Sequence, residues 1–170
     1  MITLAFDPGP TDAAWAVVDL EHNDVPAFGT AEFPVDRNPA EVEEAMMDVA
    51  LLDKPDLVAI EAVFAPVKSD KKMRVEHVIE TAKTVGLLWY LVQRIWPGIP
   101  VIEVSRMTMK AALPGGRQDW KDKQVNHCMA QLIPKLQAKQ LGLNQHTRAA
   151  AAIGYVAPGV FTMQQLKARF

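Results

Sequence analysis

The chain is poor in cysteine and has no long apolar run. Cys128 is the only cysteine among 170 residues, which excludes an intramolecular disulfide and a thiolate zinc cluster and is typical of a reducing compartment. No apolar run approaches the ~20 residues that cross a bilayer, and no basic-then-apolar leader precedes Ile2. We therefore expect a soluble, intracellular protein that makes no membrane contact.

The chain also lacks an excess of charge of either sign. Eighteen Lys and Arg residues against twenty Asp and Glu residues give a net charge of -2, so any nucleic-acid binding must use a local basic patch. Hydrophobic residues make up 49% and charged residues 22% of the chain, which excludes a disordered protein. No repeat, low-complexity tract or linker divides the sequence. We expect one domain over residues 1–170, large enough to bury a full core.

The first nineteen residues have the pattern of a β-hairpin. The β-prone run from residue 2 to residue 6 is followed by Asp7-Pro8-Gly9-Pro10, and apolar residues resume at 15–18. Gly9 permits a tight turn and the prolines fix φ beside it, so Asp7 is held stiffly at a strand end. A stiff carboxylate suits a hard metal ion. The alternative is an Asx-turn, in which Asp7 only bonds its own backbone.

The rest of the pattern predicts an α/β fold. Its mixed central sheet has three antiparallel strands followed by parallel strands, and helices flank it. The expected elements are strands at 27–35, 57–60 and 99–104, helices at 39–52, 75–96 and 120–136, a helix from 145, and a short amphipathic segment within 158–170. The helix at 75–96 is apolar on more than one face, which indicates a second contact with another helix or with a second copy of the chain.

A second buried strand also ends in a carboxylate, Glu61. A strand that follows a helical crossover lies parallel to the strand before it, and ligand sites gather at the carboxyl ends of parallel strands. We therefore expect Asp7 and Glu61 at one edge of the sheet, where a divalent cation such as Mg²⁺ would offset their repulsion. The alternative leaves Glu61 in solvent at the start of a loop.

Basic residues follow Glu61 and recur near the predicted helix at 120–136. An aromatic side chain beside a basic cluster supplies both a stacking surface and phosphate contacts for a nucleic acid. The alternative is a solvated helix start. Lysines in the first turn of a helix oppose its dipole, a local conflict that often marks a functional surface. The candidate residues are Phe64, Lys68, Lys71, Lys72, Arg74, Lys110, Lys121 and Lys123.

The last helix carries a third candidate ligand. Asn144 is a good N-cap, and His146 lies just inside it in a helix of small residues that can approach the sheet edge. The His146 ring could face a cation held by Asp7 and Glu61, although a surface histidine is the alternative. Ala149 lies one turn further on the same face, where a carboxylate would complete a four-ligand cluster.

The order of these features resembles the RuvC-type Holliday junction resolvases of the RNase H-like (retroviral integrase) superfamily. The matching segments are residues 6–9 with the strand that follows, residues 59–64, and the helix from His146 to Ile153. The resemblance implies a homodimer that binds a four-way DNA junction and nicks two strands. It also implies two Mg²⁺ or Mn²⁺ ions per site, held by Asp7, Glu61 and His146.

The resemblance assigns further roles and shows one departure. Phe64 matches an aromatic residue that disturbs base stacking, and Lys110 with either Lys121 or Lys123 matches basic residues that hold phosphates. The family has Asp where this chain has Ala149. Either an introduced Asp-to-Ala change has inactivated the enzyme, which we expect, or the protein is a natural junction binder without catalysis. The chain's size suits a bacteriophage or bacterial protein, in the cytoplasm of a bacterial or phage-infected cell.

Two other functions are compatible with parts of the pattern. A fragment of an actin-like sugar kinase would also begin with a strand hairpin bearing an Asp near a metal. However, the phosphate hairpins of those kinases are richer in Gly, Ser and Thr, and the two-lobed kinase needs a much longer chain. A flap or repair nuclease stays open, because the chemistry of the site does not dictate the shape of the DNA.

Overall fold

The computed structural model describes residues 1–34, 38–63, 75–137 and 144–169. Its elements, in chain order, are β1 (Ile2–Pro8), β2 (Asp12–Asp19), β3 (Asp24–Glu32), α1 (Pro39–Ala45), α2 (Met47–Ala50), β4 (Leu57–Glu61), α3 (Val75–Ile95), β5 (Val101–Val104), α4 (Arg106–Ala112), α5 (Asp122–Leu132), the 3-10 helix η1 (Pro134–Gln137) and α6 (Gln145–Lys167). None of the described helices is long and apolar enough to span a bilayer.

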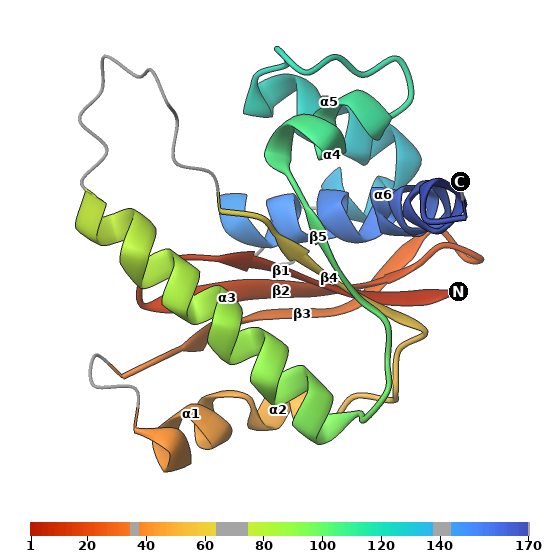
Figure 1. The fold of residues 1–170 in the computed structure, drawn as a ribbon. Coiled ribbons are helices and arrows are strands. Elements are labelled where there is room, and N and C mark those ends of the chain that lie inside the picture. The colour runs from red at the N-terminus through yellow and green to blue at the C-terminus, as the bar shows by residue number, and fades with distance from the viewer. Residues whose placement is uncertain (35–37, 64–74, 138–143, 170) are drawn as a thin grey trace.

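The strands form one mixed sheet of five in the order β3-β2-β1-β4-β5. The pairs β1–β2 and β2–β3 are antiparallel, whereas β1–β4 and β4–β5 are parallel. The sheet lies between two helical layers, with α1, α2 and α3 on one side and α4, α5 and α6 on the other (Figure 1). The predicted α/β fold with a mixed sheet is therefore confirmed.

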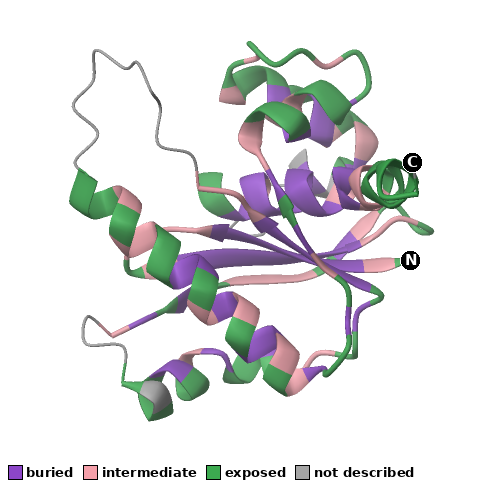
Figure 2. Cartoon of the chain, viewed as in Figure 1, coloured by how far each residue is buried: buried purple, intermediate pink, exposed green. Residues whose placement is uncertain are grey.

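The central strands are buried on both faces. Along β1, Leu4 and Phe6 belong to the core under α1, α2 and α3, while the intervening Ala5 belongs to the core under α6. This alternation follows from the two-residue period of a strand. The burial of both faces is visible along the central strands (Figure 2). The central strands are thus held between two apolar cores, which keeps their carboxyl ends in place.

Helix α6 lies unusually close to the sheet because its buried residues are small. Ala150, Ala151 and Ala152 are fully buried, and the helix packs across β1 and β2. A Cβ added at Gly154 would lie 2.7 Å from Val18 Cγ2, which is closer than packed atoms approach. The small side chains of α6 therefore bring its first turn to the edge of the sheet where β1 and β4 end.

Several predicted boundaries were wrong. Helix α6 runs without interruption through Pro158, where a separate segment was expected. Val160 and Phe161 continue to pack against the core beyond the proline, and this packing offsets the hydrogen bond that Pro158 cannot make. The expected helix at 120–136 ends at Leu132 and is followed by a 3-10 turn, because Pro134 lacks the N–H that the helix needs.

The region between β3 and β4 also differs in detail. Strand β3 covers 24–32 rather than 27–35. The expected helix at 39–52 is two short helices that meet at Met46, which is buried in the core at 1% exposure. Asn38 caps the first of them as predicted, because its Oδ1 accepts a hydrogen bond from the Ala40 N–H at 3.1 Å.

Candidate active site

Asp7 and Glu61 lie next to each other at the carboxyl ends of β1 and β4. The two strands are parallel, with Phe6 opposite Ile60, so the next residue of each strand reaches the same edge of the sheet. The turn after β1 is closed by a 2.7 Å hydrogen bond from the Gly9 N–H to the Asp12 carbonyl. The structure therefore places both predicted carboxylates at one edge of the sheet, and the turn that follows Asp7 is closed.

The two carboxylates are partly removed from water and affect each other. Burial, followed by the negative charge of the neighbouring Asp7, raises the pKa of Glu61 from its usual 4.5 to about 8. The side chain of Glu61 is 12% exposed, and its buried Oε2 has no hydrogen-bond partner among the described residues. Glu61 therefore holds a proton at neutral pH unless a cation takes its place.

His146 joins this pair from the far end of the sequence. Asn144 caps α6, and its Oδ1 accepts the Thr147 N–H at 2.9 Å, which fixes the start of the helix. His146 Nδ1 lies 2.9 Å from Asp7 Oδ2, while its side chain remains 66% exposed. The Asp7 carboxylate thus contacts a residue 139 positions away, and the three predicted ligands come from three separate segments to one place.

Arg106 is a member of the site that the sequence reasoning missed. Its guanidinium lies 3.5 Å from Glu61 Oε1 and 3.1 Å from Asp122 Oδ1. Burial raises the pKa of Asp122, but the hydrogen bond and charge of Arg106 outweigh burial and the net pKa is lowered. A signal existed: β5 lies parallel beside β4, so Arg106, two residues after β5 ends, had to reach the same edge.

The donor set fits a hard divalent cation, although the contacts would first have to open. Among the residues that the structure describes, no three His, Cys, Asp or Glu side chains are arranged to hold a metal. Asp7 Oδ2 is engaged by His146 and Glu61 Oε1 by Arg106. The orphaned Glu61 Oε2 beside a second carboxylate nevertheless offers the oxygen ligands that Mg²⁺ prefers.

A pocket of about 220 Å³ opens beside these carboxylates. Its lining includes Asp7, Glu61 and Arg106 on one side, and His77 and Thr81 from α3 on the other. The site is therefore a cleft between the sheet edge and the first turns of α3. Neither His77 nor Thr81 was expected from the sequence, because no pattern shows where a long helix starts relative to a sheet edge.

The remaining predicted residues fall in different places. Ala149 is buried on α6 at 8% exposure, one turn after His146, and its methyl group supplies no ligand. Lys110 Nζ lies 3.6 Å from Asp122 Oδ1, the same carboxylate oxygen that the Arg106 guanidinium contacts. Lys121 is exposed just before α5, and Lys123 lines a different pocket. The other candidates lie outside the described residues: Phe64, Lys68, Lys71, Lys72 and Arg74.

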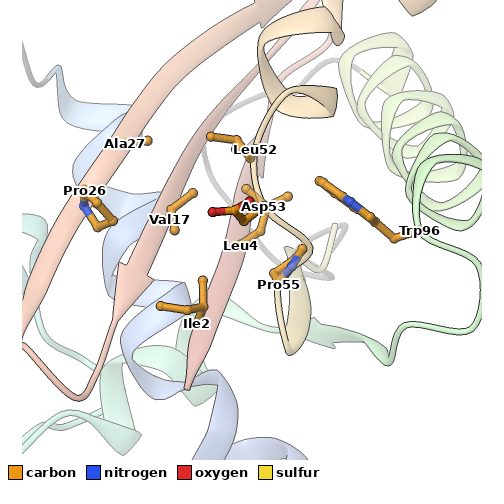
Figure 3. A pocket seen from close by; sticks show the side chains of 9 residues that line it. All are labelled: Ile2, Leu4, Val17, Pro26, Ala27, Leu52, Asp53, Pro55 and Trp96. Carbon is orange, nitrogen blue, oxygen red and sulfur yellow. The ribbon is translucent and has the colours of Figure 1, made fainter.

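An apolar pocket of about 210 Å³ lies at the opposite end of the sheet. Ile2, Leu4, Leu52 and Trp96 line it together with residues of β2 and β3 (Figure 3). Ile2 and Asp7 are separated by five positions of β1, which corresponds to about 17 Å. This pocket therefore has no part in the carboxylate site.

Comparisons with known proteins agree with this architecture. No family model and no curated protein matches the sequence. Among solved structures, Thermus thermophilus RuvC superposes with a TM-score of 0.68 and 19% identity, covering 96% of this chain and 97% of that chain. The same protein in complex with a Holliday junction substrate gives a TM-score of 0.68 and 18% identity, covering 96% of each chain.

A third solved structure is the Fowlpox virus resolvase with its substrate Holliday junction DNA, which has a TM-score of 0.48 and 18% identity, covering 98% of this chain and 99% of that chain. Over nearly its whole length, the chain has the RuvC-like RNase H fold.

Proposed function

We propose that this protein is a structure-specific DNA endonuclease that acts on four-way junctions. Its single nuclease domain would span residues 1–170. The observation that carries the proposal is the meeting of Asp7, Glu61 and His146 at the carboxyl edge of the sheet. The fold supports it, since RuvC shares the fold and is found in complex with a Holliday junction substrate. The proposed reaction is paired nicking of two strands.

Asp7, Glu61 and His146 would hold the divalent cations, Mg²⁺ or Mn²⁺, two per site in an intact enzyme. Such ions activate water and stabilise the charge that develops in an in-line displacement at phosphorus. The protein contributes two carboxylates held at strand ends and an imidazole fixed by the cap of α6. Without a cation, Glu61 is neutral through its own proton and its Oε1 lies beside Arg106, so Glu61 must give up both the proton and this contact to become a ligand.

Ala149 leaves the proposed metal site without one carboxylate ligand. A residue one turn after His146 faces the same side of α6, and the methyl group of Ala149 leaves that side one carboxylate short. We propose that an introduced Asp-to-Ala change impairs cleavage while leaving the binding surface intact. The second candidate, a natural junction binder without catalysis, is favoured by the same alanine and by the engagement of Asp7 and Glu61 with His146 and Arg106.

The DNA contacts are assigned to the aromatic and basic residues that the sequence indicated. Phe64 would disturb base stacking at the junction, and Lys68, Lys71, Lys72 and Arg74, which like Phe64 lie outside the described residues, would contact phosphates. Lys110 is suited to the same task because it lies with Arg106 beside Asp122, and its side chain is only 14% exposed. A bound phosphate would compete with Asp122 for both basic side chains.

The dimer is proposed to form on the outer face of α3. Within the described residues, Val75, Ile79 and Tyr90 are exposed at 70%, 49% and 57% on this one helix. Large exposed apolar side chains on one helix are typical of a surface that a partner covers. A second copy of the chain would bury them by an isologous contact and would set two cleavage sites on one junction.

Restoring the carboxylate tests the proposed function. We expect Ala149→Asp to cleave a four-way junction in Mg²⁺ at least about 100-fold faster than the unchanged chain, because a charged metal ligand is regained. Ala149→Asn is the matched control, since it has the same shape without the charge. Cleavage is measured on labelled junctions, and binding by gel shift against linear duplex of the same sequence.

Two results would count against the nuclease. If Ala149→Asp binds four-way junctions selectively but cuts no better than Ala149→Asn, the natural binder is favoured. If neither protein prefers the branched DNA, a general nuclease or an unrelated activity must replace junction resolution.

A further inference from the structure

A pocket with basic side chains lies on the other side of α6 from the carboxylates. It has a volume of about 380 Å³, and its polar lining comes from Lys123, Asn126 and His127 of α5 and from Arg148 of α6. The three α5 residues are spaced to share one face of that helix. The described lining contains no carboxylate, and its other members are Met129, Ala130 and Leu136.

Arg148 marks this pocket as incomplete. Its Nε is buried and has no hydrogen-bond partner among the described residues. A guanidinium donates hydrogen bonds and accepts none, so a buried Nε–H without an acceptor leaves a donor unsatisfied. Lysine, asparagine and histidine supply further donors around the same space. An anion with several oxygen atoms would satisfy these groups, whereas an apolar ligand or a cation would not.

The position of the pocket relates it to the cleavage site. Arg148 follows His146 by two residues, or about 200° around the helix. His146 faces Asp7, so Arg148 projects from the opposite side of the same turn, toward α5. A helix with its side chains is about 10–12 Å across. That width corresponds to about three nucleotides of a B-form strand at 3.4 Å each, so one strand could reach both sides.

We propose that the pocket formed by Lys123, Asn126, His127 and Arg148 binds a phosphodiester group of a nucleic acid strand beyond the cleavage site. This inference rests on the proposed function for the identity of the strand, but the donors themselves are independent of catalysis. It also separates the two lysines that the sequence left undecided: Lys123 belongs to this pocket, while Lys121 does not line it. The bound group positions the strand and takes no part in the chemistry.

The test uses the salt dependence of DNA binding. Affinities for a four-way junction and for a single-stranded oligonucleotide are measured over a range of salt concentrations for the unchanged chain, Arg148→Met and Lys123→Met/Arg148→Met. Loss of one phosphate contact should lower the slope of log K against log salt by about 0.9 on duplex DNA. Loss of its charge-assisted hydrogen bonds should weaken binding about tenfold or more.

The matched control is Lys167→Met. Lys167 lies on the same helix, about 28 Å further along its axis, and its loss changes the net charge equally. It should leave the slope unchanged. Thermal unfolding shows whether each variant folds. If Arg148→Met does not fold, two single variants replace it: Arg148→Lys, which keeps the charge but loses the guanidinium Nε–H, and Lys123→Met, which removes a charge from the pocket. Titration with inorganic phosphate, followed by NMR of the His127 ring, is the second measurement.

The outcomes separate the inference from the proposed function. Loss of slope in the pocket variants but not in Lys167→Met supports the inference, on either DNA. Equal slopes in all proteins overturn it, even if junction binding stands. A response of His127 to inorganic phosphate that the double variant loses, without any change in DNA binding, overturns the nucleic acid as the source of the phosphate. Failure of the unchanged chain to prefer junctions contradicts the proposed function alone.

Discussion

Glu61 shows how a single residue can work against the stability of the fold that holds it. Burial and the neighbouring Asp7 raise its pKa to about 8, despite the opposing charge of Arg106. The folded protein therefore binds this proton more tightly than the unfolded chain does. The stability from this group is fully present below about pH 4.5 and is lost as the pH rises through about 8.

Replacing Glu61 should remove this pH dependence. In the absence of divalent cations, Glu61→Gln should be more stable than the unchanged chain at pH 9, by on the order of a few kcal/mol, with a smaller difference at pH 5. Urea unfolding in EDTA at several pH values measures this. Glu103→Gln, at an exposed position on β5, is the control and should follow the unchanged chain. Parallel pH profiles of stability for the unchanged chain and Glu61→Gln would contradict the raised pKa of Glu61 in the folded protein.

At the scale of the element, α6 decides how close His146 comes to Asp7 and Glu61. Its buried face is built from alanines and Gly154, so its backbone lies against Ala5 and Val18 of the sheet. A helix with larger residues on this face would stand further out. His146 would then lose its contact with Asp7, although the sequence around it were unchanged.

Alanine substitutions at two glycines of α6 distinguish the effect of this packing on stability from the effect of helix propensity. Gly154→Ala should destabilise the protein by about 1–3 kcal/mol, because the new methyl group meets Val18 in a filled core. Gly159→Ala should stabilise it by about 0.5–1 kcal/mol, since nothing lies within 4 Å of the added Cβ. Urea unfolding measures both. A stabilising effect at both positions would show that α6 is not closely packed on the sheet.

At the scale of the whole molecule, the proposed dimer uses the outer face of α3 to bring two sites together. Ile79→Glu should convert a dimer to a monomer, because burying an unpaired carboxylate costs several kcal/mol, about a hundredfold or more in Kd. Sedimentation equilibrium gives the mass. Met163→Glu changes an apolar residue of similar exposure on α6 (56%, against 49% for Ile79) and should leave the dimer intact. A monomeric unchanged chain, or a dimeric Ile79→Glu, would exclude this face as the interface.

Local patterns were sufficient for much of this protein. The alternation of apolar residues predicted β1, β2 and β4, and the caps at Asn38 and Asn144 marked the starts of α1 and α6. The rule that parallel strands end at one edge of a sheet predicted that Asp7 and Glu61 lie together. Boundaries were less well predicted, because Met46 and Pro158 sit where packing with distant residues overrides the local preference for continuing or ending a helix.

The amino-acid sequence by itself determined the α/β class, the two carboxylates at strand ends, the histidine behind its cap and the alanine one turn beyond it. These depend on residues near one another in the chain. Only the tertiary structure decided that Arg106 pairs with Glu61, that His146 reaches Asp7, and that Arg148 turns away toward α5. Those contacts depend on how closely α6 and β5 approach β1 and β4, a distance set by the side chains that fill the space between them.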